Sequence, residues 1–159
     1  MPTDKPRLYD ELAQQLAALI DGERDLVANC ANMAALIYHG LPDLNWAGFY
    51  FLKGGALIVG PFQGRPACVR IALGAGVCGT AAARRATLIV PDVRQFAGHI
   101  ACDAASRSEI VIPLLQGASL LGVLDVDSPE LDRFDEADRR GLERLAALYV
   151  ASQNAAVPQ

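Results

Sequence analysis

The stretch EIVIPLLQGASLLGVLDVD, residues 109–127, gives the clearest indication of how this chain folds. It holds two apolar runs, at 109–115 and 119–127, on either side of a short turn that contains Gly117. Paired runs around a glycine turn are typical of a β-hairpin. We therefore predict two neighbouring antiparallel strands, and with them a sheet built largely from hairpins.

The segments around this hairpin predict further strands, and both ends of the chain predict helices. The aromatic-rich run 45–53 and the run 56–62 flank the turn signal KGG and predict a second hairpin. Apolar residues recur at helical spacing near both ends of the chain. The remaining expected elements are strands at 67–73 and 86–90, a short helix at 81–85, and longer helices at 7–21, 23–38 and 135–151.

This order of elements predicts an α+β domain with a central, largely antiparallel sheet of about six strands. The terminal helices are expected to cover one face of that sheet, because each layer must bury its apolar side. The length of 159 residues suits a single domain, which we expect to span residues 1–159. A hydrophobic content of 52% supplies one buried core and argues against disorder.

Charge and hydropathy exclude several classes of function. The net charge is −4 and lysines and arginines do not cluster, so we expect neither nucleic acid nor an anionic membrane as a partner. The N-terminal residues lack the apolar core of a signal peptide, and no apolar run approaches the roughly 20 residues of a membrane span. We therefore expect a cytoplasmic chain with reduced thiols.

Cys102 lies in a long polar segment, 91–108, for which no strand or long helix is predicted. Loops longer than about 12–15 residues are uncommon in compact domains and often carry function. A reactive cysteine needs nearby positive charge, such as the N-terminus of a helix, to lower its pKa. A helical turn at 103–107 would supply this, while the adjacent Asp103 acts against it.

Two other cysteines are candidates to pair with Cys102 in a redox dithiol, namely Cys68 at the start of a predicted strand and Cys78 after a glycine-rich turn. A zinc site formed by these three cysteines and His99 is an alternative. Structural zinc ligands usually come in close sequence pairs, which are absent here, so zinc is not favoured. Cys30 lies on the apolar stripe of a predicted helix and is expected to be a core residue.

Strand alternation places Leu121, Val123, Asp125 and Asp127 on one face. Two acids at the end of an apolar strand can hold a cation such as a substrate ammonium. For Asp127 the alternative is a turn-capping role before a Ser-Pro pair, whereas a buried Asp125 without a partner would be costly.

Glu109 follows the Cys102 loop and is either a carboxyl group beside the thiol or a solvated charge at the start of a strand. Trp46 and Tyr50 lie four residues apart on a predicted strand and so share a face. Packing explains both aromatic residues, but they could also form the wall of an apolar pocket.

Several motifs in the same order resemble the free methionine-(R)-sulfoxide reductase family, whose members are single GAF domains. The motifs are ACVRI around Cys68, GVCGTA around Cys78, GHIACD around Cys102, SEIVIPL and GVLDVDS. The resemblance implies a six-stranded antiparallel sheet, with the N- and C-terminal helices on one face and the active-site loops on the other.

The resemblance also implies roles for individual residues. It makes Cys102 the nucleophile, Cys68 the principal resolving cysteine and Cys78 a third redox cysteine. It places the remaining candidates around the substrate: Trp46 and Tyr50 in the pocket wall, and Glu109, Asp125 and Asp127 as the acids that hold the sulfoxide and the amino group.

The implied reaction reduces free methionine-(R)-sulfoxide through a Cys102 sulfenic acid and an intramolecular disulfide, which thioredoxin then reduces. A homodimer is implied, with no cofactor and no metal ion. The alternative function is a GAF module that senses a small molecule without catalysis. We expect that alternative less, because 159 residues leave no room for an attached output domain.

Overall fold

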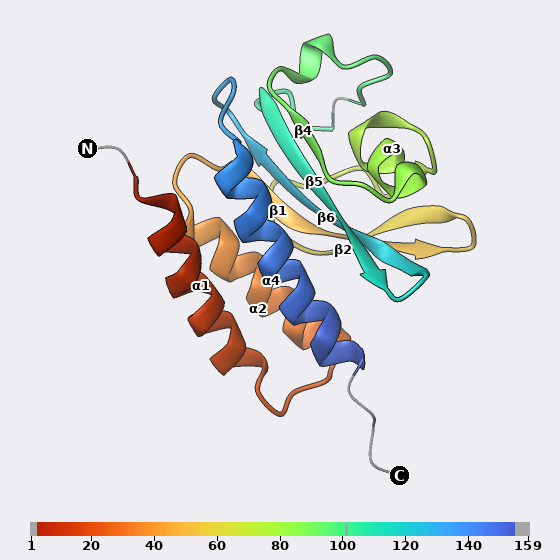
Figure 1. Cartoon of the computed structure of the whole chain (residues 1–159). Helices are drawn as coiled ribbons and strands as arrows, with labels where there is room; N and C mark the ends of the chain where they lie inside the picture. Colours follow the sequence, from red (N-terminus) through yellow and green to blue (C-terminus); the bar gives the residue numbers. More distant parts are fainter. Residues whose placement is uncertain (1–2, 101, 155–159) are drawn as a thin grey trace.

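A computed structural model describes residues 3–100 and 102–154, which form one sheet with helices on both faces (Figure 1). The helices are α1 (Lys5–Ile20), α2 (Leu26–Gly40), α3 (Gly76–Arg84), the short 3₁₀ helix η1 (Val93–Gln95) and α4 (Glu136–Asn154). The strands are β1 (Trp46–Lys53), β2 (Ala56–Gly64), β3 (Arg70–Ala72), β4 (Leu88–Val90), β5 (Ser108–Gln116) and β6 (Ser119–Ser128).

The six strands lie in the order β3-β2-β1-β6-β5-β4, and every neighbouring pair is antiparallel. The hairpin predicted from residues 109–127 is β5–β6, which pairs from Ser108 opposite Ser128 to Gln116 opposite Ser119. The hairpin β1–β2 is also present, and β1 joins the two hairpins by pairing with β6. The predicted α+β class with a six-stranded antiparallel sheet is confirmed.

Helices α1, α2 and α4 cover one face of the sheet, and α3 lies on the other with the loop around η1 (Figure 1). The larger core fills the space under the three long helices and includes Leu16, Phe49 and Tyr149. A smaller core around Leu57 and Val111 lies under α3. The candidate site shares this second face, so the long helices support the sheet without entering the site.

The ends of the long helices follow from local capping. The Asp4 side chain accepts a hydrogen bond from the Arg7 amide ahead of α1. At α4, the Asp135 and Asp138 side chains each accept from the other's backbone amide, a reciprocal capping box. Helix α2 begins at Leu26, three residues later than predicted, because the Asp25 side chain caps it by accepting from the Ala28 amide.

Two expectations around the cysteines are wrong. Cys68 does not begin a strand, since β3 starts at Arg70 and Cys68 lies in the preceding coil. Cys78 lies inside α3, which starts at Gly76 rather than at residue 81, so the glycine-rich turn before Cys78 is shorter than predicted. Gly76 allows the early start, because it has φ +61° and a side chain there would crowd Ile100.

A β-bulge in β6 also overturns one expected side-chain orientation. Leu114 pairs with Gly122, but Leu115 pairs with Leu120, so Leu121 has no partner in the ladder. Leu121 therefore packs toward the core under the long helices, while Val123 packs on the opposite face. The bulge ends before the acids, so their predicted common face is unaffected.

Within the described ranges, no helix combines the length and hydrophobicity that a bilayer-spanning segment requires.

Candidate active site

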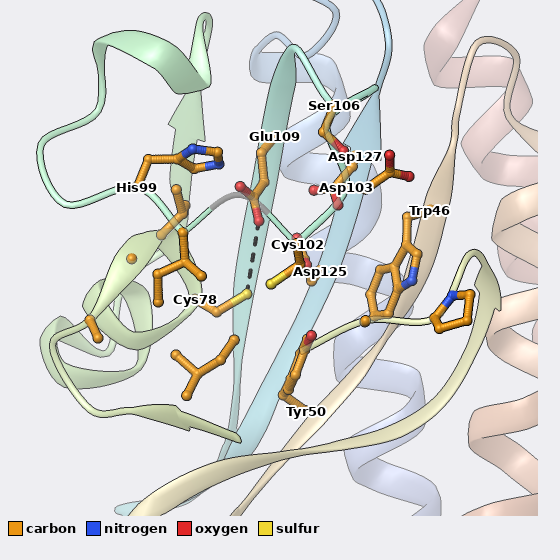
Figure 2. A pocket seen from close by; sticks show the side chains of 17 residues that line it. Trp46, Tyr50, Cys78, His99, Cys102, Asp103, Ser106, Glu109, Asp125 and Asp127 are labelled. Carbon is orange, nitrogen blue, oxygen red and sulfur yellow. Dashed lines mark hydrogen bonds between the residues drawn. The ribbon is translucent and has the colours of Figure 1, made fainter. Parts of the chain in front are cut away.

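A cavity opens on the face of the sheet opposite the three long helices (Figure 2). Its floor is formed by the acids of β5 and β6, one wall by the aromatic residues of β1, and another by the start of α3. The loop between η1 and β5 contributes His99, Cys102 and Ser106 to its lining. All eight residues selected from the sequence are near this cavity: seven line it, and Cys68 is bonded to one of the seven.

Cys102 and Cys68 are joined by a disulfide, with their Cα atoms 5.6 Å apart. Cys68 comes from the coil before β3, and the Tyr50 hydroxyl donates to its carbonyl oxygen at 3.1 Å. Cys102 comes from the long loop after η1. A disulfide, which is a bond that can be reduced and re-formed, therefore lies at the edge of the cavity.

The helical turn that was expected to follow Cys102 is absent. Residues 103–106 form a single β-turn, in which the Ser106 amide bonds to the Asp103 carbonyl. The Asp103 carboxylate accepts from the Ala105 amide at 2.9 Å, which favours this turn over a helix. Cys102 therefore does not lie at a helix N-terminus, and the expected helix-dipole effect on its thiol is wrong.

The two acids of β6 point into the cavity from adjacent positions on one face. Glu109 of β5 lies directly opposite Asp127 in the ladder, so three carboxyl groups are close together. Burial is the main cause that raises the pKa of Asp125 and of Asp127, and repulsion from neighbouring acids adds to it. One oxygen of each, Asp125 Oδ1 and Asp127 Oδ1, is buried without a hydrogen-bond partner in the described part of the chain.

Cys78 is a free, buried thiol on the same cavity. Its Sγ lies 3.8 Å from Glu109 Oε2, to which the thiol donates a hydrogen bond (Figure 2). Burial raises the pKa of Cys78 strongly, and the negative charge of Asp125 and Glu109 raises it further. A thiol in this setting is protonated and is therefore a weak nucleophile.

The aromatic wall consists of stacked rings on β1 and β2. Trp46 stacks on Tyr50 with ring centroids 5.8 Å apart and on Phe62 at 5.1 Å. The Trp46 Nε1 donates to the Arg65 carbonyl, which holds the indole edge in place. Trp46 also lies directly opposite Asp127 in the ladder, so an apolar surface adjoins a carboxyl group.

Sequence reasoning missed a polar cluster that anchors the cysteine loop. The Asn45 Nδ2 donates to Asp103 Oδ2 at 3.1 Å and to Ser106 Oγ at 3.0 Å. These contacts fasten the turn after Cys102 to the chain just before β1. The Asp-x-x-Ser pattern indicates a turn, but nothing in the sequence indicates that Asn45 lies beside it.

Cys30 lies away from the cavity, fully buried in α2 in the core under the long helices, as predicted. Burial raises the pKa of its thiol to about 12. The zinc site considered from the sequence would need Cys68, Cys78 and Cys102 as thiolates. The disulfide removes two of these, so that ligand set does not exist in this form of the protein.

The fold and the cavity define the class of protein. The GAF domain family matches residues 27–151, so the chain belongs to that family. A free methionine-R-sulfoxide reductase of Escherichia coli (strain K12) is 51% identical over 91% of this chain and 87% of its own length. One from Saccharomyces cerevisiae is 43% identical over 91% of this chain and 85% of its own length. Within the GAF domains, the chain thus belongs to the free methionine-R-sulfoxide reductase family of enzymes.

A solved structure agrees with this assignment. The free methionine-R-sulfoxide reductase from Neisseria meningitidis, in complex with its substrate, superposes with a TM-score of 0.93 at 42% identity. The match covers 98% of this chain and 93% of the other. The resemblance noted from the motifs is therefore confirmed at the level of the whole fold.

Proposed function

We propose that this protein reduces free L-methionine-(R)-sulfoxide to L-methionine. The observation that carries the proposal is the disulfide between Cys68 and Cys102 at the edge of a cavity lined by acids on one side and aromatic rings on the other. Such a cavity matches a small amino acid with a cationic end and an apolar, sulfur-containing side chain.

Substrate binding is assigned to the acids on the cavity floor and to the aromatic rings of its wall. The unpartnered oxygens of Asp125 and Asp127 can accept hydrogen bonds from the substrate ammonium. The rings of Trp46 and Tyr50 can pack against the methylene groups and the methyl group. A methionine within a polypeptide has no free ammonium, so the site favours the free amino acid.

The chemical step is a transfer of oxygen to sulfur. The Cys102 thiolate attacks the sulfoxide sulfur, the S–O oxygen takes a proton, and the oxygen passes to Cys102. Methionine leaves, and Cys102 is then a sulfenic acid. The thiol of Cys68 attacks the sulfenic sulfur, which forms the disulfide and releases water. The sulfoxide is thereby reduced by two electrons, and the two thiols are oxidised by two.

The proton for the sulfoxide oxygen is assigned to the acid cluster on the cavity floor. Burial and mutual repulsion raise the pKa of Asp125 and of Asp127, so these carboxyl groups keep a proton to a higher pH than an exposed acid does. Cys78 is assigned an auxiliary role, because its buried thiol donates to Glu109 and takes no part in the disulfide.

The proposal includes the protein's partners and setting. Thioredoxin is the expected reductant, acting by thiol exchange on the Cys68–Cys102 bond. We also propose a homodimer that works in the cytoplasm, where it repairs oxidised free methionine, without a bound cofactor.

The decisive experiment supplies the purified protein with a thioredoxin system and separate R and S epimers of methionine sulfoxide, each free and within a peptide. NADPH consumption and methionine release are measured. Turnover is expected for the free R epimer alone. Binding of that epimer without release of methionine would instead favour the sensor function and reject the reductase.

A further inference from the structure

Three buried ligand atoms meet on the cavity floor from three different elements. Cys78 Sγ of α3 and one carboxylate oxygen each from Glu109 of β5 and Asp125 of β6 lie within 4.8 Å of one another. Figure 2 shows the side chains of Cys78 and Glu109 directed toward each other, with the carboxyl of Asp125 nearby. A thiol between two carboxyl groups is a ligand set for a divalent metal ion.

A second observation points to a cation at the same place. Asp125 is only 5% exposed, and its Oδ1 has no hydrogen-bond partner among the described residues. A buried, unpaired carboxyl is costly, and a positive charge beside it removes that cost. The same negative surroundings that raise the pKa of Cys78 would attract a cation.

We propose that the disulfide form of this protein binds one thiophilic divalent cation of the Zn²⁺ class through Cys78, Glu109 and Asp125. Sulfur and oxygen ligands of tetrahedral Zn²⁺, at about 2.3 and 2.0 Å from the metal, lie roughly 3.5 Å from each other. Cys78 Sγ and Glu109 Oε2 are already 3.8 Å apart, so side-chain movements of a few tenths of an ångström would bring this pair to the metal.

The chemistry of the ligands selects the metal. Cys78 must ionise when it binds, and its proton passes to solvent. Zn²⁺ and Cd²⁺ accept a thiolate ligand, whereas Mg²⁺ and Ca²⁺ prefer oxygen ligands alone. With Cys68 and Cys102 held in their disulfide, Cys78 is the free cysteine on the cavity. The ion would occupy the position beside Asp125 that the proposed function assigns to the substrate ammonium.

The test uses the full chain with its disulfide intact and no added thiol. Calorimetric titration with Zn²⁺ is expected to show one site per chain, and titration with Mg²⁺ none. Cd²⁺ is expected to produce the ultraviolet charge-transfer band of a Cd–thiolate bond. The Cys78→Ser and Asp125→Asn variants should each lose at least about tenfold in Zn²⁺ affinity, since loss of outer-shell partners alone costs about 10–100-fold.

Cys30→Ala is the matched control, because it removes the other free thiol, which is buried in the opposite core. The Cd²⁺ band should persist in it. Unchanged Zn²⁺ affinity in folded Cys78→Ser, or a Cd²⁺ band lost in Cys30→Ala, would overturn the proposal.

A measurement on the unmutated protein covers the case in which a variant fails to fold. Zn²⁺ should slow alkylation of Cys78 and leave that of Cys30 unchanged, as read by mass spectrometry. Equal rates with and without Zn²⁺ at Cys78 would also reject the site. None of these measurements involves turnover, so the metal site and the reductase function can fail separately.

Discussion

Cys68 and Cys102 are covalently joined across a sequence separation of 34 residues, while Cys78, on the same cavity, remains a free thiol. The pairing distinguishes two candidates that spacing along the sequence alone left open. Cys68 lies in coil at the edge of the cavity, where its backbone is not held in a strand. Cys78 is buried inside α3 and held near Glu109. Four consequences for the site and one for the fold can be measured.

Replacing the two bonded cysteines should separate the chemical step from recycling. Cys102→Ser is expected to lose at least about 10³-fold in kcat, because it removes the nucleophile. Cys68→Ser should still release about one methionine per chain in a single-turnover assay and then stop with thioredoxin as reductant. Cys30→Ala, a change in the opposite core, should retain turnover. Full activity in Cys102→Ser would contradict the assignment.

The disulfide should also stabilise the fold. A cross-link closing a loop of this size is worth roughly 3–4 kcal/mol through the entropy of the unfolded chain. Dithiothreitol should therefore lower the thermal midpoint of the oxidised protein by several degrees. Cys68→Ser serves as the control, since its midpoint should not respond to the reductant. An equal drop in the thermal midpoint of both proteins would show that the disulfide does not cause the stabilisation.

Asp125→Asn should stabilise the protein most at high pH. Burial raises the pKa of Asp125 in the folded state above the unfolded value of about 3.9. The folded state therefore binds the proton more tightly than the unfolded state does. This difference contributes to the free energy of unfolding at low pH, and the contribution is lost as the pH rises toward the folded pKa.

The amide that replaces the Asp125 carboxyl in this variant does not titrate, so the advantage of the variant in unfolding free energy should grow between pH 5 and pH 8. Each tenfold difference in proton affinity is worth about 1.4 kcal/mol. Urea unfolding at both pH values measures it, with the exposed Asp21→Asn as the control for removing one negative charge. A gap that is the same at both pH values would contradict the raised pKa.

Trp46 should report ligand binding directly. It is the chain's only tryptophan, and its ring stacks on Tyr50 in the cavity wall. Free methionine, the proposed product, should change its fluorescence in a saturable way. Asp127→Asn should weaken binding roughly 10- to 150-fold, as expected for losing a hydrogen bond of about 1.5–3 kcal/mol to a charged group. Two analogues test the ammonium group. Methionine amide keeps it and serves as the comparison, whereas acetyl-methionine lacks it and should not bind.

Gly141→Ala should destabilise the fold although alanine is the better helix former. A Cβ at this position would lie within 2.4 Å of three ring atoms of Tyr9. Tyr9 cannot easily yield, because it is buried and its hydroxyl donates to Asp138 at 2.7 Å. Crowding of this kind costs about 1–3 kcal/mol, against a gain of about 1 kcal/mol in helix propensity. Arg140→Ala, in the same turn but exposed, should be nearly neutral in urea unfolding.

The elements of the fold were predictable because their signals are local. The alternation in residues 109–127 and the helical spacing near both ends identified the central strands and the long helices. The same alternation placed Asp125 and Asp127 on one face, and spacing alone put Trp46 beside Tyr50. In each case a side chain's direction follows from the backbone geometry of its own segment.

Tertiary structure decided what depends on contacts between distant segments. The hydrogen bonds of Asn45 hold the turn after Cys102 against the chain before β1, and the bulge at Leu121 reversed one side chain. The fold also decided that Cys102 pairs with Cys68 and not with Cys78. Cys78, Glu109 and Asp125 likewise come together only when α3, β5 and β6 are in their final positions. Sequence by itself determined the candidate residues for the chemistry, since residue type, spacing and motif are each properties of one segment. Only the fold decided which of them touch, because contact depends on how segments far apart in the chain pack together.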